Sequence, residues 1–360
     1  MVRTFSHTLK NNRGIALLIT ISVTTILVAV ALEYNRRARF AVISTAAMRN
    51  RITLSYMASS GIQTAMAILV KDKADNNTDS ILDDWADPEK ITAVLDAIPF
   101  ENGEISVTIA DEAGKIQVNA LVNFPESRQF NESQRQLWDR FLMHSGDEDN
   151  MQGDSEPSAI INSLKDWLDS GDDDAITGLS GAEADYYEDL EPAYTPRNGP
   201  IPDINELLLI KGITPELFYG TDEKPGIAPY LTTYGMAPGA GTTFSYPGKI
   251  NINTAELPVL MAIVPLESQD IVQALYDFRQ EMANGKDVTD ILSGTWYKEI
   301  PGLSDIRLDP NLITMSSDIF RIISSATMNG AKLTVTAVVQ RAANTKSGKW
   351  ACNILSWQIM

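Results

Sequence analysis

The stretch that decides the fold is residues 15–32, which read IALLITISVTTILVAVAL and contain no charged side chain over 18 positions. As a helix they would extend about 27 Å, close to the thickness of the hydrocarbon core of a bilayer. Arg3, Lys10 and Arg13 precede the run and favour a cytoplasmic N-terminus, but Arg36, Arg37 and Arg39 follow it closely, so the count of positive charges on its two sides does not decide the orientation. No small-residue cleavage pattern closes it, as a secretory signal peptide would require. The sequence therefore predicts a single membrane anchor.

The residues that follow the anchor remain compatible with a helix. Between positions 38 and 70 there is no proline and a single glycine, and apolar side chains recur at roughly helical spacing. One long helix of about 50 residues is predicted, with its first half in the membrane and its second half amphipathic. A membrane anchor followed by a separate soluble helix is the alternative.

Alternating polar and apolar residues predict several strands. Residues 104–110 and 115–121 form one candidate hairpin, and residues 320–327 and 332–339 form another around Met328-Asn329-Gly330. Asn-Gly between two alternating stretches is a strong hairpin signal. Residues 349–359 are one further candidate strand. The predicted fold class is α+β, with a long N-terminal helix packed on a small antiparallel sheet.

A largely helical region is predicted between the strand pairs. Apolar periodicity marks helices near 131–143 and 158–168, and two helix–turn–helix patterns follow at 204–217 and 253–282. The tryptophans are interpreted as core residues rather than as a sugar or cofactor site; they include Trp85, Trp138, Trp167 and Trp296. The region is therefore expected to be a large inserted α-helical domain, of a SAM-like or helix-hairpin-helix-like kind.

The negative charge of the chain is concentrated in one region. The chain has 29 Lys or Arg and 47 Asp or Glu, a net charge of −18, and residues 125–248 alone contain 23 acidic and 7 basic side chains. Such a balance argues against a general affinity for nucleic acid or for anionic lipid. Residues 208–214 do look like a DNA-binding hairpin, but Lys211 is the only basic residue there. A membrane-anchored DNA receptor is thus the weakest alternative.

Within the acidic region, six aspartates and one glutamate fall in residues 166–185. Carboxylates this dense repel one another unless they are solvated or bridged by a cation, and Ca²⁺ prefers six to eight oxygen ligands. The spacing does not fit an EF-hand, because Ile176 occupies a ligand position. Spacing alone leaves two readings open, namely a metal site and a solvated acidic loop.

Motifs for catalysis are not found. The sequence has no G-x-S-x-G, no phosphate-binding G-x-x-x-x-G-K and no H-E-x-x-H. Two histidines and a single cysteine, Cys352, leave little material for a histidine- or cysteine-based site. We therefore predict that the protein is not an enzyme.

The segment Asn11-Asn12-Arg13-Gly14, followed by the apolar run, resembles the processing signal of type IV pilins and type II secretion pseudopilins. The resemblance implies that a prepilin peptidase cuts between Gly14 and Ile15 and that the new N-terminus is methylated. Most members carry Glu at the fifth mature position, where this chain has Ile19. A subunit without that Glu is best placed at the fibre tip, because it has no neighbouring amine to neutralise there.

Four further segments resemble K-type minor pseudopilins in identity and in order: residues 166–169, 181–187, 204–208 and 250–255. The resemblance implies a prepilin leader (1–14), a transmembrane and amphipathic pilin helix (15–72), a first pilin part (73–124), an inserted helical domain (125–310) and C-terminal pilin strands (311–360). It also implies structural calcium in the helical domain. The expected ligands are Asp169, Asp172, Asp174, Glu183 and Asp185. Asp166 is expected to contact these ligands rather than the ion itself.

The function that this resemblance implies is assembly of a secretion fibre. The chain is expected to be a single-pass protein of the bacterial inner membrane, with its C-terminal domain in the periplasm. Its expected partners are I- and J-type minor pseudopilins, the major pseudopilin and the prepilin peptidase, and no nucleic acid. With them it would initiate a pseudopilus for the export of folded proteins across the outer membrane. A minor pilin of a type IV pilus is the closest alternative.

Overall fold

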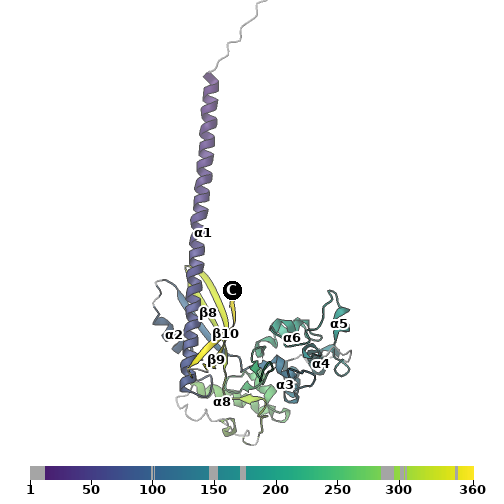
Figure 1. Ribbon diagram of the computed structural model, residues 1–360. Helices are drawn as coiled ribbons and strands as arrows, with labels where there is room; N and C mark the ends of the chain where they lie inside the picture. Colours follow the sequence, from purple (N-terminus) through teal and green to yellow (C-terminus); the bar gives the residue numbers. More distant parts are fainter. Residues whose placement is uncertain are drawn as a thin grey trace, which may run out of the picture.

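The computed structural model describes residues 13–98, 100, 102–145, 153–170, 176–284, 296–300, 304, 306–344 and 348–360. Figure 1 shows a long helix, α1, that projects from a folded body. The body consists of a sheet packed against the C-terminal half of α1 and a helical part beside the sheet. The predicted combination of a long N-terminal helix and a small antiparallel sheet is confirmed.

Helix α1 spans Arg13–Asp75 without a break, over 63 residues. The prediction of one continuous helix is therefore confirmed, and its length exceeds the prediction. Its N-terminal half exposes its apolar side chains, whereas its C-terminal half buries a stripe on the sheet. The stripe has helical spacing; it includes Leu54, Met57, Ala58, Ile62, Ala65 and Leu69. Among the described residues, α1 is the one helix long and apolar enough to cross a membrane.

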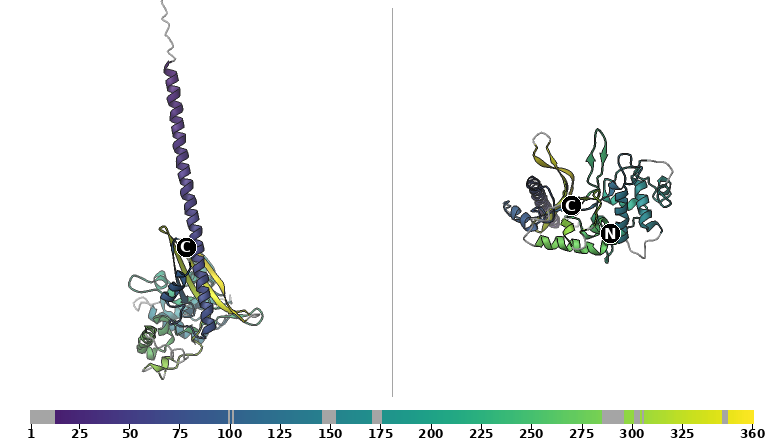
Figure 2. Two further views of the ribbon diagram at one scale, coloured as in Figure 1. Left: turned by 90° about the vertical axis from the view of Figure 1, so that its left-hand side faces the viewer. Right: turned by 90° about the horizontal axis from the view of Figure 1, so that it is seen from below.

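The main sheet has four strands in the order β1-β8-β9-β10, all antiparallel. Their bounds are Glu104–Asp111 (β1), Ile319–Met328 (β8), Ala331–Ala343 (β9) and Trp350–Ile359 (β10). Helix α1 covers one face of this sheet, and α2 (Pro88–Asp96) packs against β1 (Figure 2). Met328 pairs with Ala331 across the Asn329-Gly330 turn. The predicted C-terminal hairpin is thus confirmed.

The predicted hairpin between residues 104–110 and 115–121 is wrong. Strand β1 pairs with β8, where Ile109 lies opposite Ile322. Ile116–Gln117 forms a short strand, β2, parallel to β3 (Leu231–Thr232), and Val118–Leu121 forms a 3₁₀ turn. Every residue from 116 to 122 is buried, so this segment does not alternate between core and solvent as an outer hairpin strand does. It enters the core of the helical part instead.

The helical part has short helices around a second hydrophobic core. They are α3 (Glu132–Ser145), α4 (Pro157–Leu168), α5 (Ala184–Glu188), α6 (Pro215–Tyr219), α7 (Leu257–Ile263) and α8 (Val272–Asn284). Short strand pairs join them, namely β4 (Ala237–Pro238) with β5 (Phe244–Ser245) and β6 (Ile250–Asn251) with β7 (Ile313–Thr314). The predicted helix at 204–210 is instead a 3₁₀ helix, Ile204–Leu209.

The four tryptophans expected in the core are all buried. Trp138, Trp167 and Trp296 lie in the core of the helical part, and Trp85 lies in the core between α1 and the sheet. The body therefore has two hydrophobic cores, each with its own large aromatic side chains. The domain boundaries proposed from the sequence remain predictions.

Gly61, the single glycine in the C-terminal half of α1, lies where the helix crosses the sheet. A methyl group on Gly61 would come within 2.9 Å of Val107 Cγ2 and still closer to Ser324 Oγ. Both are side chains of the sheet face that α1 covers. Glycine at this position therefore allows the close approach of the helix backbone to β1 and β8.

Candidate functional site

The residues expected at the processing site lie at the start of α1. Gly14 is the second residue of the helix, and Ile15 and Ile19 are both more than half exposed. A side chain at Gly14 would meet no other atom within 4 Å. Residues 1–12, which include most of the expected leader, lie outside the described residues. The predicted cleavage position is thus at an accessible helix end.

Three carboxylates of the acidic region come together at the end of α4. Asp166 and Asp169 lie one turn apart in and just after α4, and Glu183 directly precedes α5. One carboxylate oxygen from each of the three lies within 4.8 Å of those of the other two, and all three residues are buried. Oxygens on opposite sides of a Ca²⁺ ion are about 5 Å apart, since each ligand lies at about 2.3–2.6 Å. The three carboxylates are thus of the ligand type that Ca²⁺ prefers and lie close enough together to share one ion, for which they would supply part of the six to eight oxygens it takes.

Backbone amides and a lysine hold these carboxylates. Asp166 accepts hydrogen bonds from the amides of Ala182 (2.9 Å) and Thr177 (3.1 Å), which ties α4 to the loop before α5. Lys165 Nζ lies 2.8 Å from Asp169 Oδ2 and 3.9 Å from Asp166 Oδ1. Burial raises the pKa of Asp166. The ammonium group of Lys165 thus supplies a positive charge beside these carboxylates.

The predicted calcium ligands are only partly brought together. Asp169 and Glu183 share the group, and Asp166, expected behind the ligands, is itself a member. Asp185 lies in the first turn of α5 and is exposed. Asp172 and Asp174 lie in residues 171–175, outside the described residues. The sequence reasoning missed Lys165, although its spacing of four residues from Asp169 on a helix indicates an ion pair.

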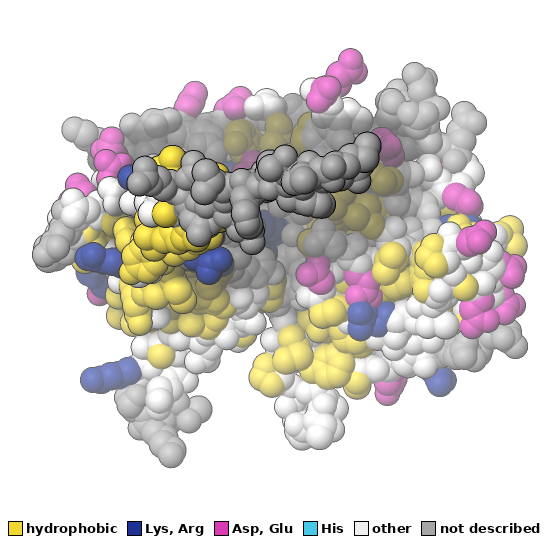
Figure 3. All heavy atoms as spheres, turned by 90° about the horizontal axis from the view of Figure 1, so that it is seen from above, with side chains coloured by type: hydrophobic (Ala, Val, Ile, Leu, Met, Phe, Trp, Pro, Cys, Tyr) yellow, Lys and Arg dark blue, Asp and Glu magenta, His cyan; other side chains and the backbone are white. Residues whose placement is uncertain are grey.

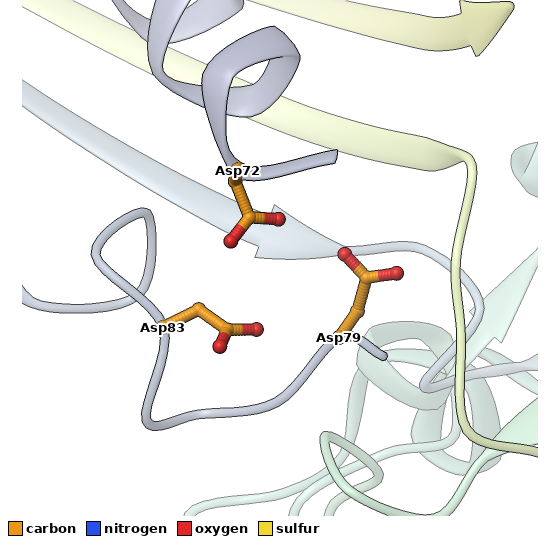
Figure 4. Close-up of side chains that lie close together, drawn as sticks. All are labelled: Asp72, Asp79 and Asp83. Atoms are coloured by element: carbon orange, nitrogen blue, oxygen red, sulfur yellow. The ribbon is translucent and has the colours of Figure 1, made fainter. Parts of the chain in front are cut away.

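A second carboxylate group lies at the C-terminal end of α1. Figure 4 shows Asp72, Asp79 and Asp83 with their carboxylates directed toward one another. The side chain of Arg341, from β9, is fully buried beside them, with Nη1 3.0 Å from Asp72 Oδ2 and Nη2 2.5 Å from Asp79 Oδ1. Three carboxyl groups thus lie around one guanidinium group. Burial, followed by the charges of Asp83 and Asp79, raises the pKa of Asp72 to about 7.

This second group is part of a polar network between the two cores. Asp79 Oδ2 accepts a hydrogen bond from the amide of Ser317, and its carbonyl accepts one from Asn251 Nδ2 (3.0 Å). Asn251 also donates to Asp111, the last residue of β1. Asn251 belongs to β6 of the helical part, whereas Asp111 and Arg341 belong to the sheet. The network therefore joins the helical part to the sheet and α1.

The stability of the protein should depend on pH through Asp72. Because its pKa is about 7 in the folded protein and near 3.8 when exposed, the folded state binds the proton more tightly. The contribution of Asp72 is therefore most favourable below about pH 4 and is lost as the pH rises through 7. We expect Asp72→Asn to reduce the fall in unfolding free energy between pH 4 and 7 by about 1–2 kcal/mol. Urea titrations of both proteins at each pH measure this, and an unchanged pH profile would contradict it.

One edge of the main sheet is exposed and apolar. β10 is an edge strand with no charged residue between 350 and 359. Edge strands are usually protected by charges, proline or a covering element, and α2 packs against the other edge strand, β1. The end of β10 instead exposes a row of apolar side chains: Ile354, Leu355, Trp357, Ile359 and Met360. We call these five residues the β10 edge.

Strand β10 begins beside the C-terminal half of α1. Lys73 Nζ lies 5.5 Å from the ring of Trp350, and Cys352 Sγ lies 3.8 Å from the carbonyl oxygen of Met66. β10 therefore runs back along α1 toward its N-terminal half, and the chain end lies beside the helix at the upper end of the sheet (Figure 1). Seen along α1, several acidic side chains gather at the outer end of the helical part, and others are scattered around the rim of the body (Figure 3).

Comparison with known families identifies the region that contains the carboxylate group. Residues 114–221 match the family model described as "Type II secretion system (T2SS), protein K". The curated protein K of Klebsiella pneumoniae is 28% identical over 215 residues, which cover 57% of this chain and 60% of that protein. Protein K of Aeromonas hydrophila is 22% identical over 62% of this chain and 63% of its own length. The matches thus span about three fifths of these curated relatives.

A solved structure shares the fold over most of the chain. A chain of the GspK-GspI-GspJ complex from the type 2 secretion system of enterotoxigenic Escherichia coli superposes with a TM-score of 0.59. The match covers 88% of this chain and 99% of that chain, at 17% sequence identity. The resemblance to K-type pseudopilins that the sequence motifs indicated is confirmed by these findings.

Proposed function

Given a type II secretion protein K domain at residues 114–221, we propose that this chain is a minor pseudopilin of the K type. The observation that carries the proposal is the combination of that domain with α1, which is a single 63-residue helix with an exposed apolar half. A subunit of this shape inserts in the inner membrane and later packs its helix against neighbouring helices in a fibre. Its role is assembly rather than catalysis.

The N-terminal half of α1 is chemically suited to both environments. Its apolar side chains are exposed, and its threonine hydroxyls donate to carbonyl oxygens of the same helix. Thr20 Oγ1 lies 2.9 Å from Leu17 O, and Thr25 Oγ1 lies 2.8 Å from Ile21 O. These hydroxyls therefore need no water, which makes them compatible with lipid. The same small polar groups suit helix–helix contacts inside a fibre.

A position at the fibre tip follows from two features. Ile19 cannot neutralise the N-terminal amine of an adjacent subunit, so the chain is best placed where no such amine follows. The helical part extends sideways from the sheet (Figure 1), and a body of this width is hard to repeat along a shaft. I- and J-type pseudopilins are the proposed tip partners, with the major pseudopilin below them, and export of folded proteins is the process served.

The maturation steps belong to the same proposal. Prepilin peptidase would cut between Gly14 and Ile15, and the new amine would be methylated. The periplasm would hold the folded body, which the helix places on one side of the membrane. Calcium bound by Asp166, Asp169 and Glu183 would have a structural role, because it would link α4 to the segment before α5.

The partner surface is proposed to include the β10 edge. An uncharged edge strand offers backbone groups and apolar side chains to an extended segment of another subunit. It also lies beside α1, so a partner that packs its helix on α1 reaches both surfaces. We expect Trp357→Lys combined with Ile359→Lys to reduce co-purification of the partners at least about tenfold, since buried aromatic anchors commonly contribute that much.

The test is co-expression of the full chain with the I- and J-type pseudopilins of the same secretion system, followed by purification from membranes in mild detergent. Val94→Lys is the matched control, because Val94 is an exposed apolar residue of α2, away from β10. The control should retain both partners. Failure of the unmodified chain to recover either partner would overturn the proposed function.

A further inference from the structure

A group of charged side chains follows the apolar span of α1 on the side of the folded body. Arg36, Arg37 and Arg39 are exposed, and we call them the arginine collar. Glu33 Oε2 accepts a hydrogen bond from Arg36 Nε at 3.0 Å, and Glu33 Oε1 accepts one from Arg37 Nε at 2.8 Å. Three arginines against one glutamate leave two net positive charges, in a chain whose net charge is −18. The helix is therefore locally positive at this level.

The collar covers a broad sector of the helix surface. At about 100° per residue, the three arginines span about 160° of the helix circumference. Glu33 lies between Arg36 and Arg37 and orients both, yet their side chains stay 67% and 78% exposed. Figure 3, which looks along α1, shows basic side chains on two sides of the apolar helix. The guanidinium groups thus point away from the helix in several directions, so each can reach a different lipid headgroup around the helix.

The position of the collar along α1 matches the headgroup layer of a bilayer. If the bilayer centre lies midway along residues 15–32, the hydrocarbon ends about ten residues later, near Glu33, at about 1.5 Å per residue. The headgroup layer adds about 5–7 Å, which places Arg36 and Arg37 within it. Arg39 lies just outside and can direct its long side chain back toward it. Tyr34, 75% exposed, lies at the same level, where tyrosine is enriched in membrane proteins.

Two further arginines on the same helix lie beyond the reach of the membrane. Arg49 and Arg51 are exposed on α1, but they lie about 15–20 Å beyond the headgroup layer by the same helical rise. That distance is about twice the Debye length at physiological salt. Arg49 and Arg51 are therefore the same residue type on the same helix as the collar, but they lie too far from the membrane to contact lipid headgroups.

We propose that the arginine collar binds the phosphate groups of anionic phospholipids in the leaflet that faces the folded body. This inference rests on the proposed membrane anchor, and it adds a lipid class to it. Bound phosphates hold the helix at a set depth in the bilayer before assembly. Withdrawal of the subunit into a fibre must break these contacts, so the collar sets a barrier to premature extraction.

The test uses the full chain reconstituted in vesicles that contain phosphatidylglycerol and phosphatidylcholine. Spin-labelled versions of each lipid report which one is enriched at the protein surface. We expect a severalfold preference for phosphatidylglycerol, which falls at high salt, since each basic residue near a charged surface contributes about fivefold. Arg36→Gln, Arg37→Gln and Arg39→Gln together should abolish the preference. Glu33→Gln should strengthen it, because it removes the one opposing charge.

Arg49→Gln with Arg51→Gln is the matched control and should leave the preference unchanged. A control that loses as much as the collar variant would overturn the proposal, and so would unmodified protein without any preference. If the collar variant keeps its lipid preference but loses partner subunits, the arginines bind an acidic protein surface and the lipid proposal is wrong. Resistance to alkaline extraction is measured in parallel, since loss of membrane insertion would count against the anchor itself.

Discussion

Arg341→Met is expected to lower the free energy of unfolding by about 3–5 kcal/mol at pH 7.5, because it leaves buried carboxylates without their counter-charge. The Arg341 side chain is fully buried between Asp72 and Asp79, and it also donates to the carbonyl oxygens of Leu69 and Ser317. These partners come from α1, from the loop after it and from the segment before β8. Loss of one side chain therefore disconnects several elements at once.

The measurement is urea denaturation of the full chain in detergent, with Lys90→Met as the control. Lys90 pairs with Asp84 in an ion pair in which both side chains are more than half exposed, so its loss should change the unfolding free energy by less than about 0.5 kcal/mol. The Arg341 effect should also shrink toward pH 5, where Asp72 is protonated. A loss below about 1 kcal/mol at pH 7.5 would show that the carboxylates do not need this arginine.

Removal of calcium is expected to lower the melting temperature of the helical part by about 5–10 °C. A ligand at a hundred times its dissociation constant stabilises the folded state by about 2.7 kcal/mol, and each kcal/mol shifts the melting temperature by about 2–4 °C in a unit of this size. The expected cause is the loss of the link between α4 and Glu183. Calorimetric titration of the full chain with Ca²⁺ measures the affinity, and thermal melting with and without EDTA measures the change in melting temperature.

Asp169→Asn should weaken calcium binding at least about tenfold, because the number of ligand charges sets affinity at such sites. Asp189→Asn is the control, since Asp189 is an exposed aspartate in the same acidic region. Its calcium affinity should stay close to that of the unmodified chain. If calorimetry detects no Ca²⁺ binding and EDTA leaves the melting temperature unchanged, the calcium proposal fails.

The two ends of the chain show how far local patterns reach. The long helix follows from an uncharged run and continued helical spacing, both of which are visible in neighbouring residues. The β8–β9 hairpin follows from Asn329-Gly330 between two alternating stretches, and Met328 does pair with Ala331. In each case the interacting residues lie within a few positions of one another, so the pattern that predicts the element also contains its partner.

The segment after β1 shows where local patterns stop. Its alternation predicted a return strand beside β1, but the partner of β1 is β8, where Ile105 pairs with Ala326. An alternating strand can pair with any strand that buries a matching face. The pairing partner of β1 is therefore decided by the packing of the whole sheet on α1 and not by the alternation itself. The residues 116–122 have a more favourable place in the second core, where all of them are buried.

The candidate site divides in the same way. The carboxylates of residues 166–185 left a metal site and a solvated loop open, and the resemblance to K-type pseudopilins implied calcium. Two of the five expected ligands, Asp169 and Glu183, meet there with Asp166. No pattern indicated the group at Asp72, Asp79 and Asp83, because its counter-charge, Arg341, lies far away in the sequence. The three arginines after the apolar run are visible in the sequence, but their exposure and the pairing of Arg36 and Arg37 with Glu33 come from the structure.

The sequence by itself determined the long helix with its apolar run, the concentration of acidic residues and the resemblance to K-type pseudopilins, because each depends on residues close together in the chain. The tertiary structure decided the partner of β1, the pairing of Arg341 with two aspartates, and the exposure of the β10 edge beside α1. Those features depend on how the sheet packs against α1 and how the core of the helical part joins the sheet. Packing brings together side chains that no spacing along the chain relates.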